Sequence, residues 1–104
     1  MQVFGQNLRR LLGLHDLRAR EAARLIGVSP QSLSEWTRGH RRPNLQMLLR
    51  VASFLEISGD RLVQAQFREL LVREVADRAR FELVEAKIRA HRAQPQRAQR
   101  RRTA

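Results

Sequence analysis

The sequence predicts an all-α protein of about five helices, the last one extended, followed by a disordered basic tail. Apolar residues recur at spacings of three and four, as on one face of a helix. Serine, asparagine, glycine and proline separate these segments, as at helix ends. From residue 92 onward the chain has five arginines and no acidic residue, so this part cannot bury a core. We therefore divide the chain into a domain (1–66), a helical extension (67–92) and a tail (93–104).

The composition favours one small domain with a polyanionic partner. At 104 residues there is room for one domain of ordinary size. The chain lacks cysteine, a signal-peptide pattern and an apolar run of membrane-spanning length, so we expect it to act in a reducing cytoplasm, without a membrane. The net charge of +11 points to a polyanion. A membrane surface is the competing reading, but the basic residues are not confined to one amphipathic helix.

The first helix is expected over residues 2–14. Phe4, Leu8, Leu11 and Leu12 form its stripe for the core. The next segment, residues 17–43, reads as helix, tight turn, helix, and we expect the rest of the chain to be arranged around it.

The turn within residues 17–43 is marked by three residue types in order. Gly27 falls where the helix over residues 19–26 needs a residue that tolerates positive φ. Ser29 can cap free amides, and Pro30 fits the first position of the next helix.

The helix expected over residues 30–38 has two different faces. Leu33 and Trp36 share one face, and we assign Trp36 to the core. The other face carries an amide, two hydroxyls and a carboxylate: Gln31, Ser32, Ser34 and Glu35. A short helix of this kind suits insertion into a DNA major groove.

The run resembles the helix-turn-helix of phage lambda-repressor-like regulators, also called the xenobiotic-response-element family. The residues that fit the family pattern are Leu17, Ala23, Ile26, Gly27, Val28, Ser29, Leu33, Ser34, Trp36, Gly39 and Pro43. The resemblance covers about residues 4–65, and it implies double-stranded DNA as the partner.

The resemblance implies that three positions of the second helix reach base edges. These are Pro30, which cannot make a side-chain hydrogen bond, Gln31 and Glu35. Gln31 can bond an adenine edge, and Glu35 can accept from a cytosine amino group or instead orient a neighbouring arginine. Ser32 and Ser34 can reach a base or a phosphate, or remain solvated. We assign Gln31, Ser32 and Glu35 to the bases.

A second group of residues is expected to bind phosphates. Its members are Arg18, Arg20, Ser34, Arg38, His40, Arg41 and Arg42. Arg18 or Arg20 would replace a glutamine that often makes a phosphate contact in the family. Arg41 or Arg42 could also enter a minor groove.

The C-terminal half is expected to contain two helices. The first, over residues 44–55, is capped by Asn44 and is the most apolar segment, so it should pack across the first three helices and fix the angle of the recognition helix. The second begins at Ser58 and Asp60 and meets no glycine or proline before Pro95.

The extension carries two lines of apolar residues, and the domain is too short to cover a helix of this length. Apolar residues left uncovered need a partner. The first line is Phe67, Leu71, Val75, Ala79, Leu83, Ala86 and Ala90, and the second is Phe81, Val84 and Ile88. Either the helix folds back on its own domain, or it pairs with a second chain, which we favour as a homodimer through residues 67–92. The apolar spacing of about 3.6 to 3.8 residues per turn favours a short antiparallel or crossed contact, or a break near residues 73–80, over a long zipper. The pairs Glu69–Arg73, Glu74–Arg78 and Glu85–Arg89 would support the helix.

No pattern points to catalysis. His15, His40 and His91 are scattered, and no metal ligand set, cofactor motif or small-molecule site is evident. We expect a sequence-specific transcriptional repressor of the phage or prophage immunity type that acts by occupying an operator. The alternatives are an antitoxin or chromosomal regulator whose C-terminal helix binds a protein partner, and an interaction protein whose DNA binding is vestigial.

Overall fold

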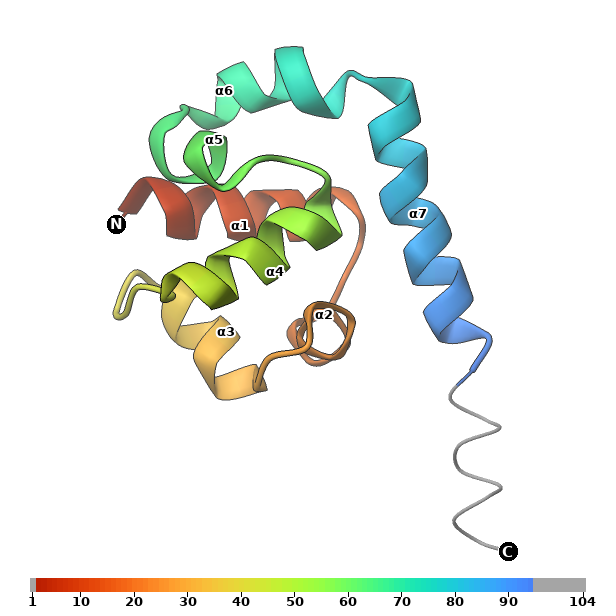
Figure 1. Cartoon of the computed structure of the whole chain (residues 1–104), viewed down its shortest axis with the longest axis horizontal. Coiled ribbons are helices and arrows are strands. Elements are labelled where there is room, and N and C mark those ends of the chain that lie inside the picture. The colour runs from red at the N-terminus through yellow and green to blue at the C-terminus, as the bar shows by residue number, and fades with distance from the viewer. Residues whose placement is uncertain (1, 95–104) are drawn as a thin grey trace, which may run out of the picture.

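The computed structural model describes residues 2–94, and every regular element in this part of the chain is a helix, as predicted. Figure 1 shows the order of the elements. They are α1 (Gln2–Leu14), α2 (Ala19–Ile26), α3 (Pro30–Thr37), α4 (Leu45–Leu55), α5 (Gly59–Gln64), α6 (Phe67–Leu70), the π-helical turn η1 (Leu71–Val75) and α7 (Arg78–Arg92). None of these helices is long and apolar enough to cross a membrane. The predicted disordered tail lies outside the described residues, apart from Ala93 and Gln94.

The predicted end of α2 and the predicted starts of α3, α4 and α5 are confirmed. Gly27 ends α2 with φ of 87° and donates its N–H to Ala23. The hydroxyl of Ser29 accepts from the backbone N–H of Ser32 at 3.1 Å. Asn44 and Ser58 cap α4 and α5 in the same way. These short-range bonds satisfy amides that a helix cannot satisfy itself.

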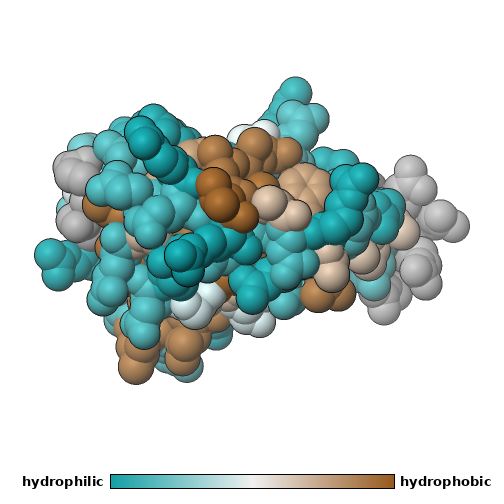
Figure 2. Space-filling model, turned by 90° about the horizontal axis from the view of Figure 1, so that it is seen from above, coloured by the Kyte–Doolittle hydropathy of each residue, from teal (hydrophilic) through white to brown (hydrophobic). Residues whose placement is uncertain are grey.

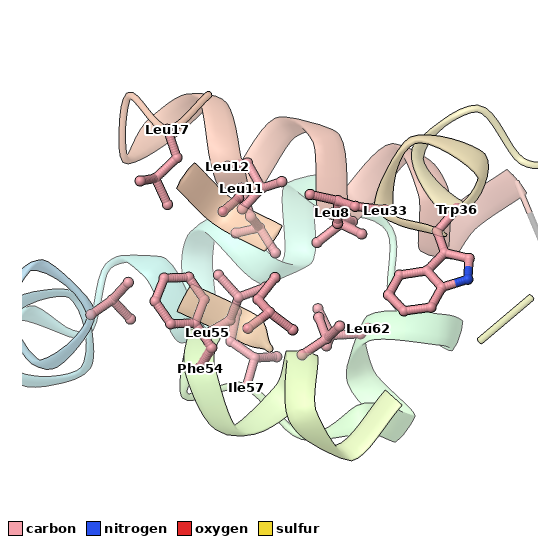
Figure 3. Packing of buried hydrophobic residues seen from close by; sticks show 14 of the residues in the cluster. Leu8, Leu11, Leu12, Leu17, Leu33, Trp36, Phe54, Leu55, Ile57 and Leu62 are labelled. Carbon is pink, nitrogen blue, oxygen red and sulfur yellow. The ribbon is translucent and has the colours of Figure 1, made fainter. Parts of the chain in front are cut away.

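The recognition helix α3 is held by α1 and α2. Its Leu33 and Trp36 are buried, and Figure 3 shows them among the core side chains. The main contacts of α3 are with α1 and α2, so the expectation that α4 packs across all of the first three helices is wrong. α4 packs instead against α2, α5 and α7, and its Leu45 and Leu49 face outward.

The single helix expected beyond residue 60 is divided into shorter pieces. Asn7, which is buried in α1, donates from its side-chain amide to the carbonyl oxygens of Leu62 and Ala65, both at 2.9 Å. These bonds satisfy the end of α5, and the chain turns into α6. A second break follows η1, where Asp77 caps α7. This break lies inside the window predicted for it.

The second apolar line folds back on the domain. α7 descends beside the domain in Figure 1, and its Val84 and Ile88 are buried, with 1% and 2% of their surface exposed. α7 contacts both α2 and α4. The prediction that the extension folds back on its own domain is therefore confirmed for the line that contains Val84 and Ile88. Leu71 and Leu83 of the other line remain exposed.

Polar bonds across the fold anchor the extension. The ammonium of Lys87 donates to the carbonyl oxygens of Ser53 and Phe54 at 2.7 and 3.1 Å, at the C-terminal end of α4. The same ammonium lies 2.7 Å from a carboxylate oxygen of Glu56. A cation at this place satisfies carbonyl groups that have no partner inside the helix and complements the helix dipole.

The three helix-stabilising pairs predicted within the extension are wrong. Glu74 instead binds Arg61 at 2.9 Å, and Glu69 lies 4.0 Å from the same arginine. Glu85 binds His15, whose ring stacks on Phe81. These carboxylates therefore join the extension to α1 and α5 and do not stiffen a free helix.

Candidate nucleic-acid interface

α3 presents its polar face outward. Leu33 and Trp36 turn inward, so Gln31 is exposed and Ser32, Ser34 and Glu35 are half-buried at the surface. The side chain of Gln31 has no hydrogen bond to the described residues, which leaves both its donor and its acceptor free. An amide free in this way can pair with an adenine edge.

The two serines of α3 differ in their bonds. Ser32 accepts a hydrogen bond from the hydroxyl of Ser29 at 2.9 Å, and it keeps its own proton to donate. The backbone carbonyl of Ser34 accepts from the hydroxyl of Thr37 at 3.0 Å. Ser32 thus has a structural role at the start of α3 in addition to the base contact predicted for it.

Glu35 orients Arg41. The two side chains lie 3.3 Å apart, with Arg41 70% exposed and Glu35 23% exposed. The backbone N–H groups of His40 and Arg41 also donate to the carbonyl oxygen of Glu35, at 2.9 and 3.4 Å. Of the two roles predicted for Glu35, orienting an arginine is the one adopted in the protein without DNA. The ion pair is exposed, so DNA can replace it at small cost.

Basic side chains continue beyond α3. Arg38, His40 and Arg42 are exposed in the segment that leaves the helix, and Gly39 makes the turn there with φ of 75°. Within residues 2–94 these three side chains form no ion pair. Their donors are free for an anion.

The beginning of α2 carries the other predicted phosphate ligands. Arg18 and Arg20 are exposed there, and α2 has no side-chain cap. α2 packs against α3, so these arginines and α3 belong to one rigid unit. The structure thus places every predicted site residue at the surface of α2, α3 or the segment after α3.

Two ties near this surface were missed from the sequence. Arg50 of α4 donates to the carbonyl oxygen of Gly27 at 2.5 Å and so fixes the turn between α2 and α3. Arg92 of α7 makes two bonds to Glu21 of α2, at 2.7 and 3.0 Å. The partners are 23 and 71 residues apart, and no local pattern signals them.

The Arg92–Glu21 bond changes the acidity of both groups. The hydrogen bond from Arg92 holds the pKa of the Glu21 carboxyl below its usual value, against a smaller effect of burial. The same bond raises the pKa of Arg92. Glu21 therefore carries its negative charge throughout the neutral range.

The described residues contain no group of three or more histidine, cysteine, aspartate or glutamate side chains that could hold a metal ion. His15, in the turn after α1, has one carboxylate partner among the described residues, Glu85, and its ring stacks on Phe81 of α7.

Comparison with known proteins identifies the family. A family model described as "Helix-turn-helix" matches residues 8–62, just over half of the chain. Neither the comparison with curated proteins nor that with solved structures found a match. The matched region runs from α1 to α5 and includes the whole surface described above. The chain therefore belongs to the lambda-repressor-like helix-turn-helix family of DNA-binding transcriptional regulators.

Proposed function

We propose that this protein is a sequence-specific repressor, of the type that maintains phage or prophage immunity, and that it acts by occupying an operator. The observation that carries this proposal is the outward face of α3, where Gln31 is exposed and free of partners. Arginines lie at both ends of the helix-turn-helix, and the chain has a net charge of +11. Phosphate contacts of this kind position a protein, and base contacts then specify the sequence.

The contacts have separate tasks in this mechanism. Gln31 pairs with an adenine, while Ser32 and Glu35 contact neighbouring base edges or set the orientation of Arg41. Arg18, Arg20, Ser34, Arg38, His40, Arg41 and Arg42 bind phosphates. The bound protein then excludes RNA polymerase from a promoter that overlaps the site.

A homodimer through residues 67–92 would place two recognition helices on one duplex. Three apolar side chains of this extension remain exposed: Leu71 by 38%, Val72 by 71% and Leu83 by 51%. Figure 2 shows apolar surface in the middle of the face that carries α6 and η1. A second copy could cover these side chains, and two-fold related helix-turn-helix units read half-sites about one helical turn apart.

The test is transcription from a template in which a site bound by the protein overlaps the promoter. The wild-type protein should reduce the transcript, and Gln31→Ala should restore it at equal protein concentration. A template with the site moved upstream of the polymerase footprint is the control and should stay active. Repression of both templates alike would contradict operator occupancy.

The exposed Val72 and Leu83 also favour a second candidate, a regulator or antitoxin whose extension binds a different protein. In that case a small protein would purify with the chain and bind it with defined stoichiometry. Val72→Asp would abolish this complex but leave DNA binding by the isolated protein unchanged.

A further inference from the structure

The last turn of α7 and the first turns of α2 together form a basic hollow. It has a volume of about 300 Å³ and is lined by Arg18, Arg20, Glu21, Arg24, His91 and Arg92, here called the α2–α7 cluster. α7 contacts α2, and in Figure 1 its C-terminal end lies at the same side of the molecule as α2 and α3.

The cluster keeps an excess of positive charge. It holds four arginines against the single carboxylate of Glu21. Arg92 forms an ion pair with Glu21, whereas Arg18, Arg20 and Arg24 are exposed and make no ion pair within residues 2–94. Like charges held together without counter-charges repel each other, and a bound anion relieves the repulsion.

The place of the cluster in the fold indicates which anion it meets. Arg18 and Arg20 stand at the start of α2, one of the two helices of the helix-turn-helix, and α2 is packed against α3. A duplex read by α3 would bring its backbone alongside α2. Residues 95–104, which follow α7 in the sequence, contain four arginines and no acidic residue.

We propose that the α2–α7 cluster binds the phosphate backbone of DNA beside the base pairs read by α3, with Glu21 limiting its charge. Resting on the DNA binding of the proposed function, this gives α7 a second task. Arg92 lies outside the matched helix-turn-helix region, so the extension supplies a cation that the domain alone lacks. In the structure Arg92 is bound to Glu21. A DNA phosphate that approaches the cluster competes with the Glu21 carboxylate for Arg92.

Two substitutions with opposite expected effects test the proposal. Glu21→Gln removes the only carboxylate of the cluster, so binding to any duplex should tighten, and affinity should depend more steeply on salt. Arg24→Ala should weaken binding to all sequences alike and lower the slope of log affinity against log salt by about one. Arg24 does not take part in the Glu21–Arg92 bond, so its replacement leaves α7 anchored.

Arg92→Ala and Arg78→Ala form the matched pair within α7. Both remove one exposed arginine from the same helix, but Arg78 lies at its other end, outside the cluster. Arg92→Ala should weaken binding and reduce the salt slope, while Arg78→Ala should leave both near wild type. The readout is fluorescence anisotropy of the full chain with labelled duplexes over a range of salt concentrations.

Equal effects of Arg92→Ala and Arg78→Ala, or no tightening with Glu21→Gln, would overturn the proposal. A gain of affinity in Glu21→Gln cannot arise from misfolding, which guards against that explanation. Measuring a preferred and a scrambled duplex tests sequence-specific binding separately from phosphate binding by the α2–α7 cluster. If wild type binds both duplexes equally, the proposed sequence-specific function is wrong. Phosphate binding by the cluster is tested independently, by the salt slopes of the variants on either duplex.

Discussion

At Gly5 the backbone of α1 comes so close to that of α3 that no side chain fits. A Cβ atom at this position would lie 2.5 Å from the carbonyl oxygen of Trp36 and 3.3 Å from that of Thr37. Both neighbours are backbone atoms, which cannot rotate away. Gly13 of the same helix differs, because a Cβ there meets nothing within 4 Å.

These two glycines give a matched stability prediction. Gly5→Ala should lower the free energy of unfolding by about 1–3 kcal/mol or more, because α3 must move off α1. Gly13→Ala should raise it by roughly 0.5–1 kcal/mol, because alanine favours the helix. Urea denaturation followed by circular dichroism measures both. Similar effects of the two substitutions would refute the close approach of α1 and α3.

Gln31 and Arg41 differ in what they can read. Gln31→Ala should cost about 1–3 kcal/mol on the preferred duplex and little on others, so that base preference relaxes. Arg41→Ala should weaken all duplexes alike, because a phosphate contact carries no sequence information. Competition titrations with duplexes altered at one base pair would separate the two. Uniform losses for both variants would contradict the assignment.

At the scale of elements, α7 is joined to the domain by a few polar bonds around two buried side chains. Lys87→Met removes the bonds to the carbonyl oxygens of Ser53 and Phe54 and the ion pair with Glu56. We expect a loss of roughly 1–2 kcal/mol in the docking of α7, because these groups are partly exposed. Hydrogen exchange should then be faster in α7 and unchanged in α3. Arg78→Met is the control, and faster exchange there as well would show that the helix itself had weakened.

The Glu21–Arg92 bond makes the same docking depend on pH. The pKa of Glu21 is lowered in the folded protein from an ordinary value of 4.5. The bond therefore stabilises α7 docking fully above the ordinary value, and this contribution is lost as the pH falls through the lowered pKa. Arg92→Ala should raise the pKa of Glu21 toward its ordinary value, as followed by NMR titration of its carboxyl carbon. An unchanged titration curve would mean that Arg92 does not set this pKa.

The helix ends that were predictable from the sequence are those set by neighbouring residues, and another involves residues far apart in the chain. Gly27, Ser29, Asn44 and Ser58 act on amides within three or four residues, and the ends of the first helices were predictable for that reason. The division after α5 involves Asn7, more than fifty residues away, which no local pattern signals. A local signal was available at the start of α6, where the backbone N–H of Gln66 donates to the carboxylate of Glu69. Asp77 was a signal that could have been used, since aspartate favours the N-cap and it lies inside the predicted break.

The candidate interface was predictable to a similar degree. The polar face of α3 followed from the helical spacing of Leu33 and Trp36, and both are buried. Arg92 reaches the start of α2 only because α7 folds back on the domain. The apolar lines of the extension were equally compatible with pairing to a second chain, so this contact was not predictable. Which line faced the domain was decided by packing across the fold, including the bond of the single lysine, Lys87.

At the scale of the whole molecule, a net charge of +11 on 12.1 kDa sets how the protein meets DNA. Exposed arginines lie on most elements, and those at the start of α2, in the segment after α3 and at the end of α7 border the candidate interface. The exposed apolar side chains Leu71, Val72 and Leu83 lie instead on the extension. These side chains are available to a second copy of the chain and lie outside the helix-turn-helix.

The proposed dimer has a direct test. Val72→Asp and Leu83→Asp should each shift the protein from dimer to monomer in sedimentation velocity, because a carboxylate would have to be buried in the interface. Leu45→Asp is the control, since Leu45 is 71% exposed but lies on α4 outside the extension. The circular dichroism spectra of all three should match wild type. A wild-type protein that sediments as a monomer at tens of micromolar, or a dimer that survives both substitutions, would contradict the proposed interface.

The most direct test of the central claim is selection of bound duplexes from a random DNA pool at near-physiological salt, with wild type and Gln31→Ala in parallel. The account predicts that wild type enriches a two-fold symmetric motif with half-sites about one helical turn apart. It further predicts that Gln31→Ala loses the preference at one base pair of each half-site. Enrichment of no motif by wild type, at protein concentrations that saturate the pool, would contradict sequence-specific recognition by α3.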